Sequence, residues 1–406
     1  MLGKYFQRKA QRFDNDLILP MREFKDKKIL LISHNLNIEG APISLLLIGS
    51  ILIKNGFSVD VLSLREGQLK ENYLSLGIQV FNISDKFDYN EYDLIIANTV
   101  LTYKYINLLK DKVPSIWFIR ESKNIMDFEK IYPDLAINIH YMPYIYCVSE
   151  MAKNFIDSRY RQKVKVLHNF CLDSYRNIEN TLSDKVQFTF VGTLCSRKGI
   201  EILLNVFNNL NAKYANKYQL NIIGKFFEET VAYKQKLKNK IKSNPNIIYH
   251  GIKLDNEKQE LYEKTNVFVI PSLEEPASRV AIEACMIGRP LIVTQNVGAK
   301  YLVTPDTGWV VKTGDIESLK KCIEKILDNK FDLIYMGKKA REMYLNTSSL
   351  EIYKKEILKI INFHISKNLI CQKSIVELFQ NFCLIFKSKI TNINLIKTVK
   401  YLITQI

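Results

Sequence analysis

The sequence predicts an α/β protein built from two doubly wound parallel sheets. Short apolar runs rich in Ile, Val and Phe alternate with longer amphipathic stretches, and this alternation occurs twice along the chain. The runs are almost continuously apolar, which is typical of parallel strands covered on both faces. The length of 406 residues and the hydrophobic fraction of 47% suit two domains with separate cores.

The elements follow one another in the order strand, helix, strand, helix, which predicts crossover connections between parallel strands. The strands are expected at eight apolar runs: 28–33, 93–99, 115–120, 144–149, 186–192, 218–224, 267–272 and 290–295. The helices are expected where the apolar residues recur with a period near 3.6, at 42–54, 149–158, 199–213, 229–243, 278–287 and 315–328.

Changes in composition divide the chain into six expected segments. A polar stretch without a clear period separates the two alternating sets and is interpreted as the interdomain linker. The segments are a basic N-terminal arm at 1–27, a first domain at 28–170, the linker at 171–185, a second domain at 186–345, a crossover helix at 346–361 and a basic amphipathic tail at 362–406.

The charge balance favours anionic partners. Lys and Arg number 58 and Asp and Glu number 42, giving a net charge of +16. The tail at 362–406 has six lysines, one glutamate and many Ile, Leu and Phe residues. It is interpreted either as two helices lying on an anionic membrane surface or as two helices packing on the protein's own core, and internal packing is slightly favoured.

Several classes of protein find no support in the sequence. The longest apolar stretch, 43–53, is too short to span a membrane, and the N-terminus has no apolar signal core, so a cytoplasmic protein is expected. The seven cysteines lack zinc or redox spacing. The only compact Asp-x-Asp, at 14–16, lies in the N-terminal arm, so no metal is expected in the reaction.

The stretch 267–294 is the most informative about chemistry. A strand ends at Pro271, a loop carries Glu275, and a helix is expected to begin at the N-cap residue Ser278. Backbone N–H groups at the start of that helix form an anion site, and these belong to Arg279, Val280 and Ala281. Glu283 follows about 7 Å along the helix axis. Two carboxylates flanking an anion site match a nucleotide sugar, in which a diphosphate joins ribose to sugar.

Glu275 and Glu283, separated by seven residues, resemble the paired-glutamate signature of retaining glycosyltransferases of group 1 and family 4. The surrounding pattern agrees, with Pro-Ser at 271–272, Ala284 after the second glutamate, and Gly-Arg-Pro at 288–290 before the next apolar run. The resemblance covers about 28–360 and is more specific in the second half. It implies the GT-B fold, in which two Rossmann-like domains face each other across a cleft, with C-terminal helices.

The resemblance implies roles for residues of the second domain. Glu283 would hold the nucleotide ribose, and Glu275 would contact the donor sugar. Arg197 and Lys198, in VGTLCSRKGIEILL, would neutralise the leaving diphosphate, since fixed cations stabilise charge that develops in a transition state. Gly192 in the same stretch belongs to the phosphate-side loop.

In the first domain, the resemblance places Gly40 in the loop after the first strand, where backbone can approach the phosphates or the sugar. Many family members have a histidine after the strand expected at 115–120. Arg120 or Glu121 occupies that region here, so Arg120 is a candidate catalytic residue.

The implied function is a metal-independent transfer, with retention, of a hexosyl-type sugar from a nucleoside diphosphate donor of the UDP or GDP type. The acceptor would be a saccharide or a lipid-linked saccharide in bacterial surface polysaccharide biosynthesis, of lipopolysaccharide or capsule, at the inner face of the cytoplasmic membrane. One alternative is a sugar-nucleotide epimerase of the same fold. Another is a non-catalytic protein that binds nucleic acid or membrane, although no interleaved basic and aromatic stretches favour nucleic acid.

Overall fold

The computed structural model describes residues 27–86, 88–109, 112–122, 124–132, 134–174, 184–227, 230–328 and 331–366. The chain divides into two units between Leu358 and Lys359. Both sheets belong to the first unit. Of the expected segments, nearly all of the N-terminal arm, most of the linker and most of the basic tail lie outside the described residues.

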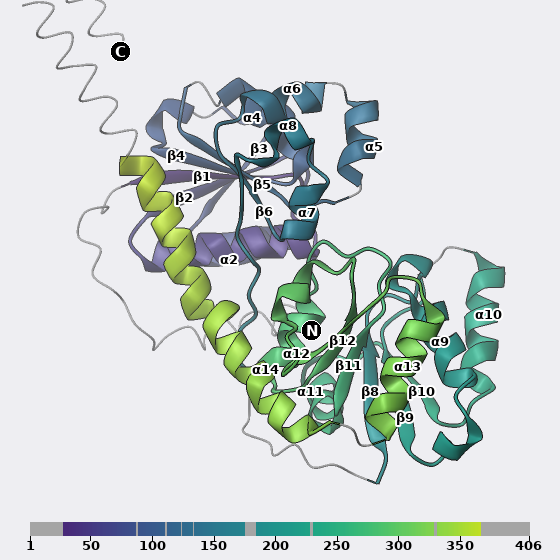
Figure 1. Ribbon diagram of the computed structural model, residues 1–406. Coiled ribbons are helices and arrows are strands. Elements are labelled where there is room, and N and C mark those ends of the chain that lie inside the picture. Colours follow the sequence, from purple (N-terminus) through teal and green to yellow (C-terminus); the bar gives the residue numbers. More distant parts are fainter. Residues whose placement is uncertain are drawn as a thin grey trace, which may run out of the picture. The chain divides into compact units, whose positions relative to one another are not determined.

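The first sheet has seven parallel strands in the order β3-β2-β1-β4-β5-β6-β7 (Figure 1). The strands are β1 (Lys28–Ser33), β2 (Ser58–Ser63), β3 (Gln79–Asn82), β4 (Leu94–Asn98), β5 (Ser115–Ile119), β6 (Ile145–Cys147) and β7 (Val164–Val166). Helices connect them: α2 (Gly40–Lys54), α3 (Lys70–Ser75), α4 (Tyr103–Leu109), α5 (Asn124–Ile131), α6 (Asp134–Tyr141), α7 (Glu150–Asn154) and α8 (Ser158–Arg161), with 3₁₀ turns η2 (Tyr89–Glu91) and η3 (Val100–Thr102).

The second sheet has six parallel strands in the order β10-β9-β8-β11-β12-β13. The strands are β8 (Val186–Val191), β9 (Tyr218–Ile223), β10 (Ile247–Gly251), β11 (Val267–Ile270), β12 (Leu291–Thr294) and β13 (Gly308–Val311). Its helices are α9 (Ile200–Asn208), α10 (Val231–Lys242), α11 (Asp255–Lys264), α12 (Arg279–Met286), α13 (Ile316–Leu327) and α14 (Leu333–Thr347), with 3₁₀ turns η4 (Ser196–Lys198), η5 (Ala212–Tyr214) and η6 (Gly298–Leu302). A further helix covers 350–366.

The strand order reverses once in each sheet, between β1 and β4 and between β8 and β11. In doubly wound folds, ligands bind outside the carboxyl ends of the strands at this point. The residues just beyond these ends are therefore the candidates for function. They include His34 and Thr99 in the first sheet and Gly192 and Pro271 in the second. The two Rossmann-like domains predicted from the sequence are confirmed.

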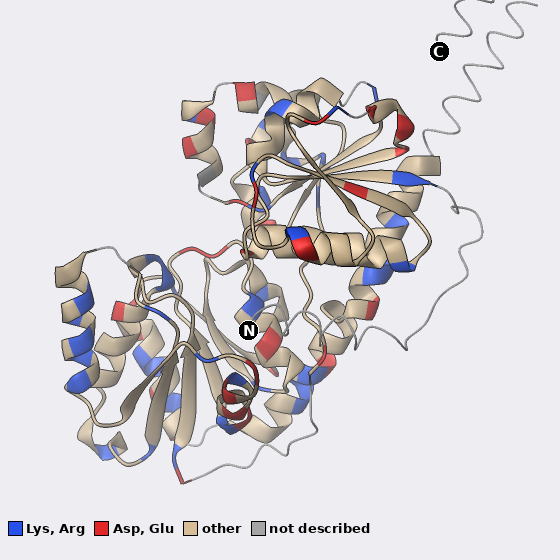
Figure 2. Ribbon diagram, turned by 180° about the vertical axis from the view of Figure 1, so that it is seen from behind, with Lys and Arg blue, Asp and Glu red and all other residues tan. Residues whose placement is uncertain are grey.

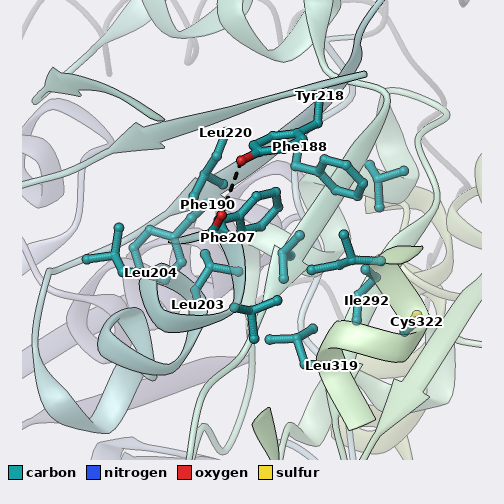
Figure 3. Packing of buried hydrophobic residues seen from close by; sticks show 14 of the residues in the cluster. Phe188, Phe190, Leu203, Leu204, Phe207, Tyr218, Leu220, Ile292, Leu319 and Cys322 are labelled. Carbon is teal, nitrogen blue, oxygen red and sulfur yellow. Dashed lines mark hydrogen bonds between the residues drawn. The ribbon is translucent and has the colours of Figure 1, made fainter. Parts of the chain in front are cut away.

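Apolar side chains cover both faces of the second sheet. On one face, residues of α9 and α13 pack on β8 and β9, and Figure 3 shows Phe188, Phe207 and Tyr218 among the side chains of this cluster. The Tyr218 hydroxyl donates to the Phe207 carbonyl at 3.1 Å, so the buried phenol is satisfied. On the other face, residues of α12 and α14 pack on β11 and β12. Helices therefore pack on both faces of the second sheet, and this packing holds the end of β11 in place, where the loop with Glu275 begins.

Two expected helices are shorter than the periodicity predicts. The helix expected at 149–158 ends at Asn154 as α7, and a separate helix, α8, begins at Ser158, where the Asp157 carboxylate accepts a hydrogen bond from the Arg159 N–H. The stretch 199–213 ends as a helix at Asn208 and resumes as η5, where the Asn211 side chain accepts from the Lys213 N–H. In both cases a short polar side chain bonds to nearby backbone and interrupts the helix.

Positive charge recurs along α10, at the left edge of Figure 2. Its sequence, VAYKQKLKNKIK, holds five lysines and no acid. Among the described residues, no helix is both long and apolar enough to cross a membrane.

Gly199 fixes η4 against the end of β11. Its φ is +69°, and a Cβ there would lie 2.0 Å from the Pro271 carbonyl oxygen. Gly251 has a nearly identical φ of +70° but open space around the Cβ position.

Replacing each glycine by alanine separates the cost of the left-handed backbone, which both positions share, from the cost of the close contact, which only Gly199 has. Gly251→Ala should cost about 1–2 kcal/mol of unfolding free energy, the price of a left-handed alanine. Gly199→Ala should cost about 2 kcal/mol more, because backbone at the end of β11 must move. Urea unfolding followed by circular dichroism measures both. Equal losses in the two variants would contradict the close packing at Gly199.

Candidate functional site

Glu275 is a buried carboxylate with a complete set of partners. Only 7% of the residue is exposed. Its Oε1 accepts from the Lys198 ammonium at 2.7 Å, and its Oε2 accepts from the Ser272 hydroxyl at 2.8 Å. Its backbone N–H donates to the Asn296 carbonyl at 3.0 Å. A buried charge is costly unless it is paired and hydrogen-bonded, so these contacts hold Glu275 in one position.

The backbone around Glu275 is held by a second loop. The Gly298 N–H donates to the Glu275 carbonyl at 2.8 Å, and Glu275 and Val297 form an isolated parallel bridge. A Cβ at Gly298 would lie 1.9 Å from the Pro276 carbonyl oxygen, so only glycine lets the loops approach so closely. The loop after β12 therefore supports the loop after β11.

Arg197 and Lys198 both contact the Glu275 loop. They lie in η4, between β8 and α9. The Arg197 guanidinium donates to the Glu274 carbonyl at 2.8 Å, and the Leu273 N–H donates to the Arg197 carbonyl at 2.8 Å. Both cations therefore lie at the loop of Glu275, and their expected contact with the leaving diphosphate stays a prediction. In this structure, however, one N–H of Lys198 is already used by the carboxylate.

The start of α12 has the geometry of an anion site. Ser278 is the N-cap, and its hydroxyl accepts from the Ala281 N–H at 3.3 Å. Arg279 is the first helical residue, and the N–H groups of Arg279 and Val280 have no intrahelical acceptor. No acidic residue lies in the first turn to occupy the positive end of the helix dipole.

Glu283 lies farther along α12 and is held by α11. Its Oε2 accepts from the Lys258 ammonium and from the Tyr262 hydroxyl, each at 2.8 Å. Burial opposes ionisation, but the charges of Lys258 and Arg279 and the two hydrogen bonds outweigh it and keep the pKa of Glu283 below its ordinary value. Glu283 is therefore an ionised acceptor at neutral pH.

In the first domain, Arg120 follows β5 and is held by two amide side chains. Its Nε donates to Asn98 Oδ1 and its Nη1 donates to Asn169 Oδ1, both at 2.9 Å. The Glu121 carboxylate accepts instead from the N–H groups of Val100 and Arg120, at 3.2 and 2.9 Å. Burial raises the pKa of Glu121, against the effect of these bonds and of Arg120. The guanidinium is thus oriented by neutral acceptors.

The two predicted glycines occupy different settings. Gly192 directly follows β8, with φ of +154°. Gly40 is the first residue of α2, not a loop residue as predicted, and Asn98 donates to the carbonyl of the next residue, Ala41, at 2.9 Å. Helix α2 begins earlier because the Ile43 N–H donates to the carbonyl of the N-cap residue Glu39 at 3.1 Å, which places Gly40 in the first helical turn. No neighbouring atom lies within 4 Å of a Cβ at Gly40, so packing does not require glycine there.

Two serines of the first domain contact the Glu275 loop. The Ser122 hydroxyl donates to Glu274 Oε1 at 2.5 Å, and the Ser149 hydroxyl donates to the Pro276 carbonyl at 2.6 Å. Ser122 is two residues from Arg120, so the structure brings the segment of Arg120 to the loop of Glu275, although no direct contact joins those two side chains.

The sequence did not predict the residues that form hydrogen bonds to Glu275, Glu283 and Arg120. Ser272, Lys258 and Tyr262 bond to the two glutamates, and Asn98 and Asn169 orient Arg120. A weak signal existed for one pair, because Lys258 and Tyr262 are four apart on a helix and must share a face. Nothing in the sequence pairs Asn98 with Asn169.

The histidines near the strand ends have partners of their own. His34 Nδ1 lies 3.3 Å from the Thr99 hydroxyl, and His168 stacks on Tyr301 at 3.6 Å between ring centroids. Burial lowers the pKa of both imidazoles. Among the described residues, no three His, Cys, Asp or Glu side chains lie close enough together to hold a metal ion.

Comparison with protein families identifies both halves of the chain. The model of glycosyl transferases group 1 matches residues 173–343, and that of glycosyl-transferase family 4 matches residues 25–170. The first match contains Arg197, Lys198, Glu275 and Glu283, and the second contains Gly40 and Arg120.

Individual relatives are distant. The capsular polysaccharide biosynthesis glycosyltransferase CapM of Staphylococcus aureus is 27% identical over 202 residues, which are 50% of this chain and 51% of that protein. The chain thus spans about half the length of that relative. The lipopolysaccharide 1,2-N-acetylglucosaminetransferase of Salmonella typhimurium is 23% identical over 67% of this chain and 73% of its own length.

Solved structures agree on the fold. Anabaena HepE in complex with UDP superposes with a TM-score of 0.69 at 16% identity, covering 83% of this chain and 100% of that chain. The same protein in complex with UDP-glucose gives a TM-score of 0.65 at 15% identity, over 82% of this chain and 99% of that one. The two family models together match most of the chain, and the two-sheet architecture agrees with the solved structures. The chain therefore belongs to the glycosyltransferases described by the group 1 and family 4 models, which have the GT-B fold.

Proposed function

We propose that the protein transfers a sugar, with retention, from a nucleoside diphosphate sugar to a saccharide or lipid-linked acceptor. The observation that carries this proposal is the buried Glu275 carboxylate paired with Lys198, three residues before the N-cap of α12, with Glu283 on the same helix. Such an arrangement offers an anion site between two hydrogen-bonding carboxylates, and a nucleotide sugar has a diphosphate between two groups of hydroxyls.

The donor is proposed to be a UDP sugar, with GDP sugars as the alternative. Support comes from the fold neighbour HepE, whose structures hold UDP and UDP-glucose. The diphosphate would lie at the N–H groups of Arg279 and Val280, the ribose at Glu283, and the sugar at Glu275. Gly192, beyond β8, and Gly40, at the start of α2, would let backbone approach the phosphates.

In the proposed reaction, the acceptor hydroxyl attacks the anomeric carbon on the face from which the diphosphate leaves. The bond between that carbon and the phosphate oxygen breaks, and a phosphate oxygen takes the hydroxyl proton. Arg197 and Lys198 would stabilise the charge that develops on the diphosphate, a task for fixed cations in a site that needs no metal. Arg120, held by two asparagines, would face the sugar from the first domain.

The pathway proposed is assembly of a bacterial surface polysaccharide such as capsule or lipopolysaccharide. Two relatives of the chain carry those roles by name. The peripheral membrane location proposed with it rests on the basic composition of the tail at 362–406, which lies outside the described residues. An epimerase would convert the donor without an acceptor, and a nucleic-acid-binding protein would bind RNA or DNA with steep salt dependence.

The donor is testable by thermal shift. UDP and UDP sugars should raise the unfolding temperature, because a ligand that binds only the folded state stabilises it by mass action. GDP and GDP sugars at the same concentration should give smaller shifts. If no nucleotide or nucleotide sugar shifts the transition, while single-stranded RNA does, the glycosyltransferase proposal is wrong.

Turnover should depend on Glu275. Glu275→Gln removes the negative charge that Lys198 and Ser272 hold, and should lower kcat by about 10²–10³, the usual loss for a group that acts on charge in the transition state. Release of UDP from UDP sugars, coupled to a spectrophotometric assay, measures it. Glu257→Gln, which alters an exposed carboxylate paired with Lys253 on the surface, is the control and should keep full activity.

The ionisation of Glu283 predicts a pH dependence of stability. Because its folded pKa lies below the unfolded value of about 4.3, its contribution is present above that pH and is lost as pH falls through the folded pKa. At pH 7, Glu283→Gln should therefore unfold with about 1–2 kcal/mol less free energy than the wild type. In urea titrations the gap should close below about pH 4. A gap that stays constant with pH would show that Glu283 is not ionised in the folded protein.

A further inference from the structure

Both donors that fix Glu283 come from one face of α11. Lys258 and Tyr262 are four residues apart, and the Lys258 ammonium lies 4.8 Å from the centroid of the Tyr262 ring. Each donates to the same carboxylate oxygen, Oε2, at 2.8 Å. Because Oε2 accepts both hydrogen bonds, the Glu283 carboxylate is held in one orientation about its terminal side-chain bond.

The other oxygen of Glu283, Oε1, accepts no hydrogen bond from the described part of the chain. The side chain still keeps 16% of its surface exposed. An ionised carboxylate oxygen has lone pairs for two donors. Glu283 therefore has one oxygen bonded to α11 and one oxygen that takes no donor from the described residues.

The two donors differ in how firmly they are placed. Tyr262 is only 3% exposed, and its ring packs edge-on against Phe268 of β11 at 4.9 Å. Burial, then the charge of Glu283, keeps the pKa of Tyr262 well above its ordinary value, so its hydroxyl remains a donor. Lys258 is more exposed, at 30% of its side chain, and contributes charge as well as a hydrogen bond.

We propose that Lys258 and Tyr262 are positioning residues that turn Glu283 Oε1 toward the ribose and so determine how strongly the site distinguishes ribose from deoxyribose. This inference rests on the proposed function, in which Glu283 holds the ribose. Two vicinal hydroxyls need an ionised acceptor that is fixed in rotation, because a carboxylate free to rotate loses entropy when it binds them. Lys258 and Tyr262 supply that fixed acceptor before the nucleotide arrives.

The test is a comparison of dissociation constants for UDP, 2′-deoxy-UDP and 3′-deoxy-UDP, measured by isothermal titration calorimetry with the full chain. The wild type should bind UDP about tenfold more tightly than at least one deoxy form, the effect of a hydrogen bond to a charged group. Lys258→Met and Tyr262→Phe should each reduce this ratio to about threefold or less, while the affinity for the deoxy form stays within about twofold.

Three further variants separate positioning from other roles. Lys258→Arg keeps the positive charge and a hydrogen-bond donor. It should therefore retain most of the wild-type preference for UDP over the deoxy form. Lys253→Met is the matched control, because Lys253 has 27% of its side chain exposed and pairs with Glu257 instead of Glu283. In a Glu283→Gln background, Lys258→Met should have no further effect on the ratio, since the two residues act through one group.

Several results would overturn the inference. If Lys258→Met weakens UDP and both deoxy forms equally, Lys258 acts on the phosphates and not through Glu283. If the ratio is unchanged in Lys258→Met and Tyr262→Phe, rotation of Glu283 does not matter for ribose recognition. If the wild type binds UDP without distinguishing the deoxy forms, the inference fails while nucleotide binding stands. If the wild type binds no UDP at all, the proposed UDP donor fails with it.

Discussion

The contact between Lys198 and Glu275 is the interaction on which the rest of the site depends. Two opposite charges, 19% and 9% exposed, meet at 2.7 Å beyond the carboxyl ends of β8 and β11. A pair this buried offsets its desolvation only when the geometry is good and the remaining lone pairs are satisfied. Ser272 meets that need for Glu275, and the glycines at 199 and 298 let the three supporting loops come close enough to hold it.

The parallel topology explains why these groups meet at all. Residues far apart in sequence, such as Lys198 and Glu275, follow neighbouring strands whose carboxyl ends lie at the same edge. The two glutamates then acquire different surroundings. Glu275 lies in a loop and is enclosed by a cation and a hydroxyl, whereas Glu283 lies on a helix with one oxygen held and one open. These different surroundings fit the proposal that Glu275 contacts the donor sugar and Glu283 the ribose.

The sequence was informative where the signal is local. Continuous apolar runs predicted β1 over its observed range, and Ser278 was recognised as the N-cap of α12 because the hydroxyl of an N-cap serine bonds to backbone three residues on. Glu275 and Glu283 were identified together from the seven residues that separate them and from their resemblance to a known signature. Whether each predicted residue binds the donor is still a prediction.

Other features could not be predicted because they depend on tertiary contacts. The first turn of α2 is joined to β4 by the hydrogen bond from Asn98 to the Ala41 carbonyl, and the orientation of Arg120 follows from asparagines that come from β4 and from the stretch after β7. Lys258 and Tyr262 belong to a polar helix without an apolar period. Their spacing of four residues places them on one helix face, but nothing in the sequence connects that face to Glu283. Supporting residues of this kind are dispersed along the chain and are joined only by the fold.

The loop and helix between Glu275 and Glu283 are proposed to hold a nucleotide by its diphosphate. Hydrogen–deuterium exchange with and without UDP tests it most directly, because bound phosphate oxygens would engage the N–H groups at the start of α12. Slower exchange in peptides covering 275–283 and 196–199 is the predicted result. Unchanged exchange there, with protection confined to another region of the chain, would contradict the account.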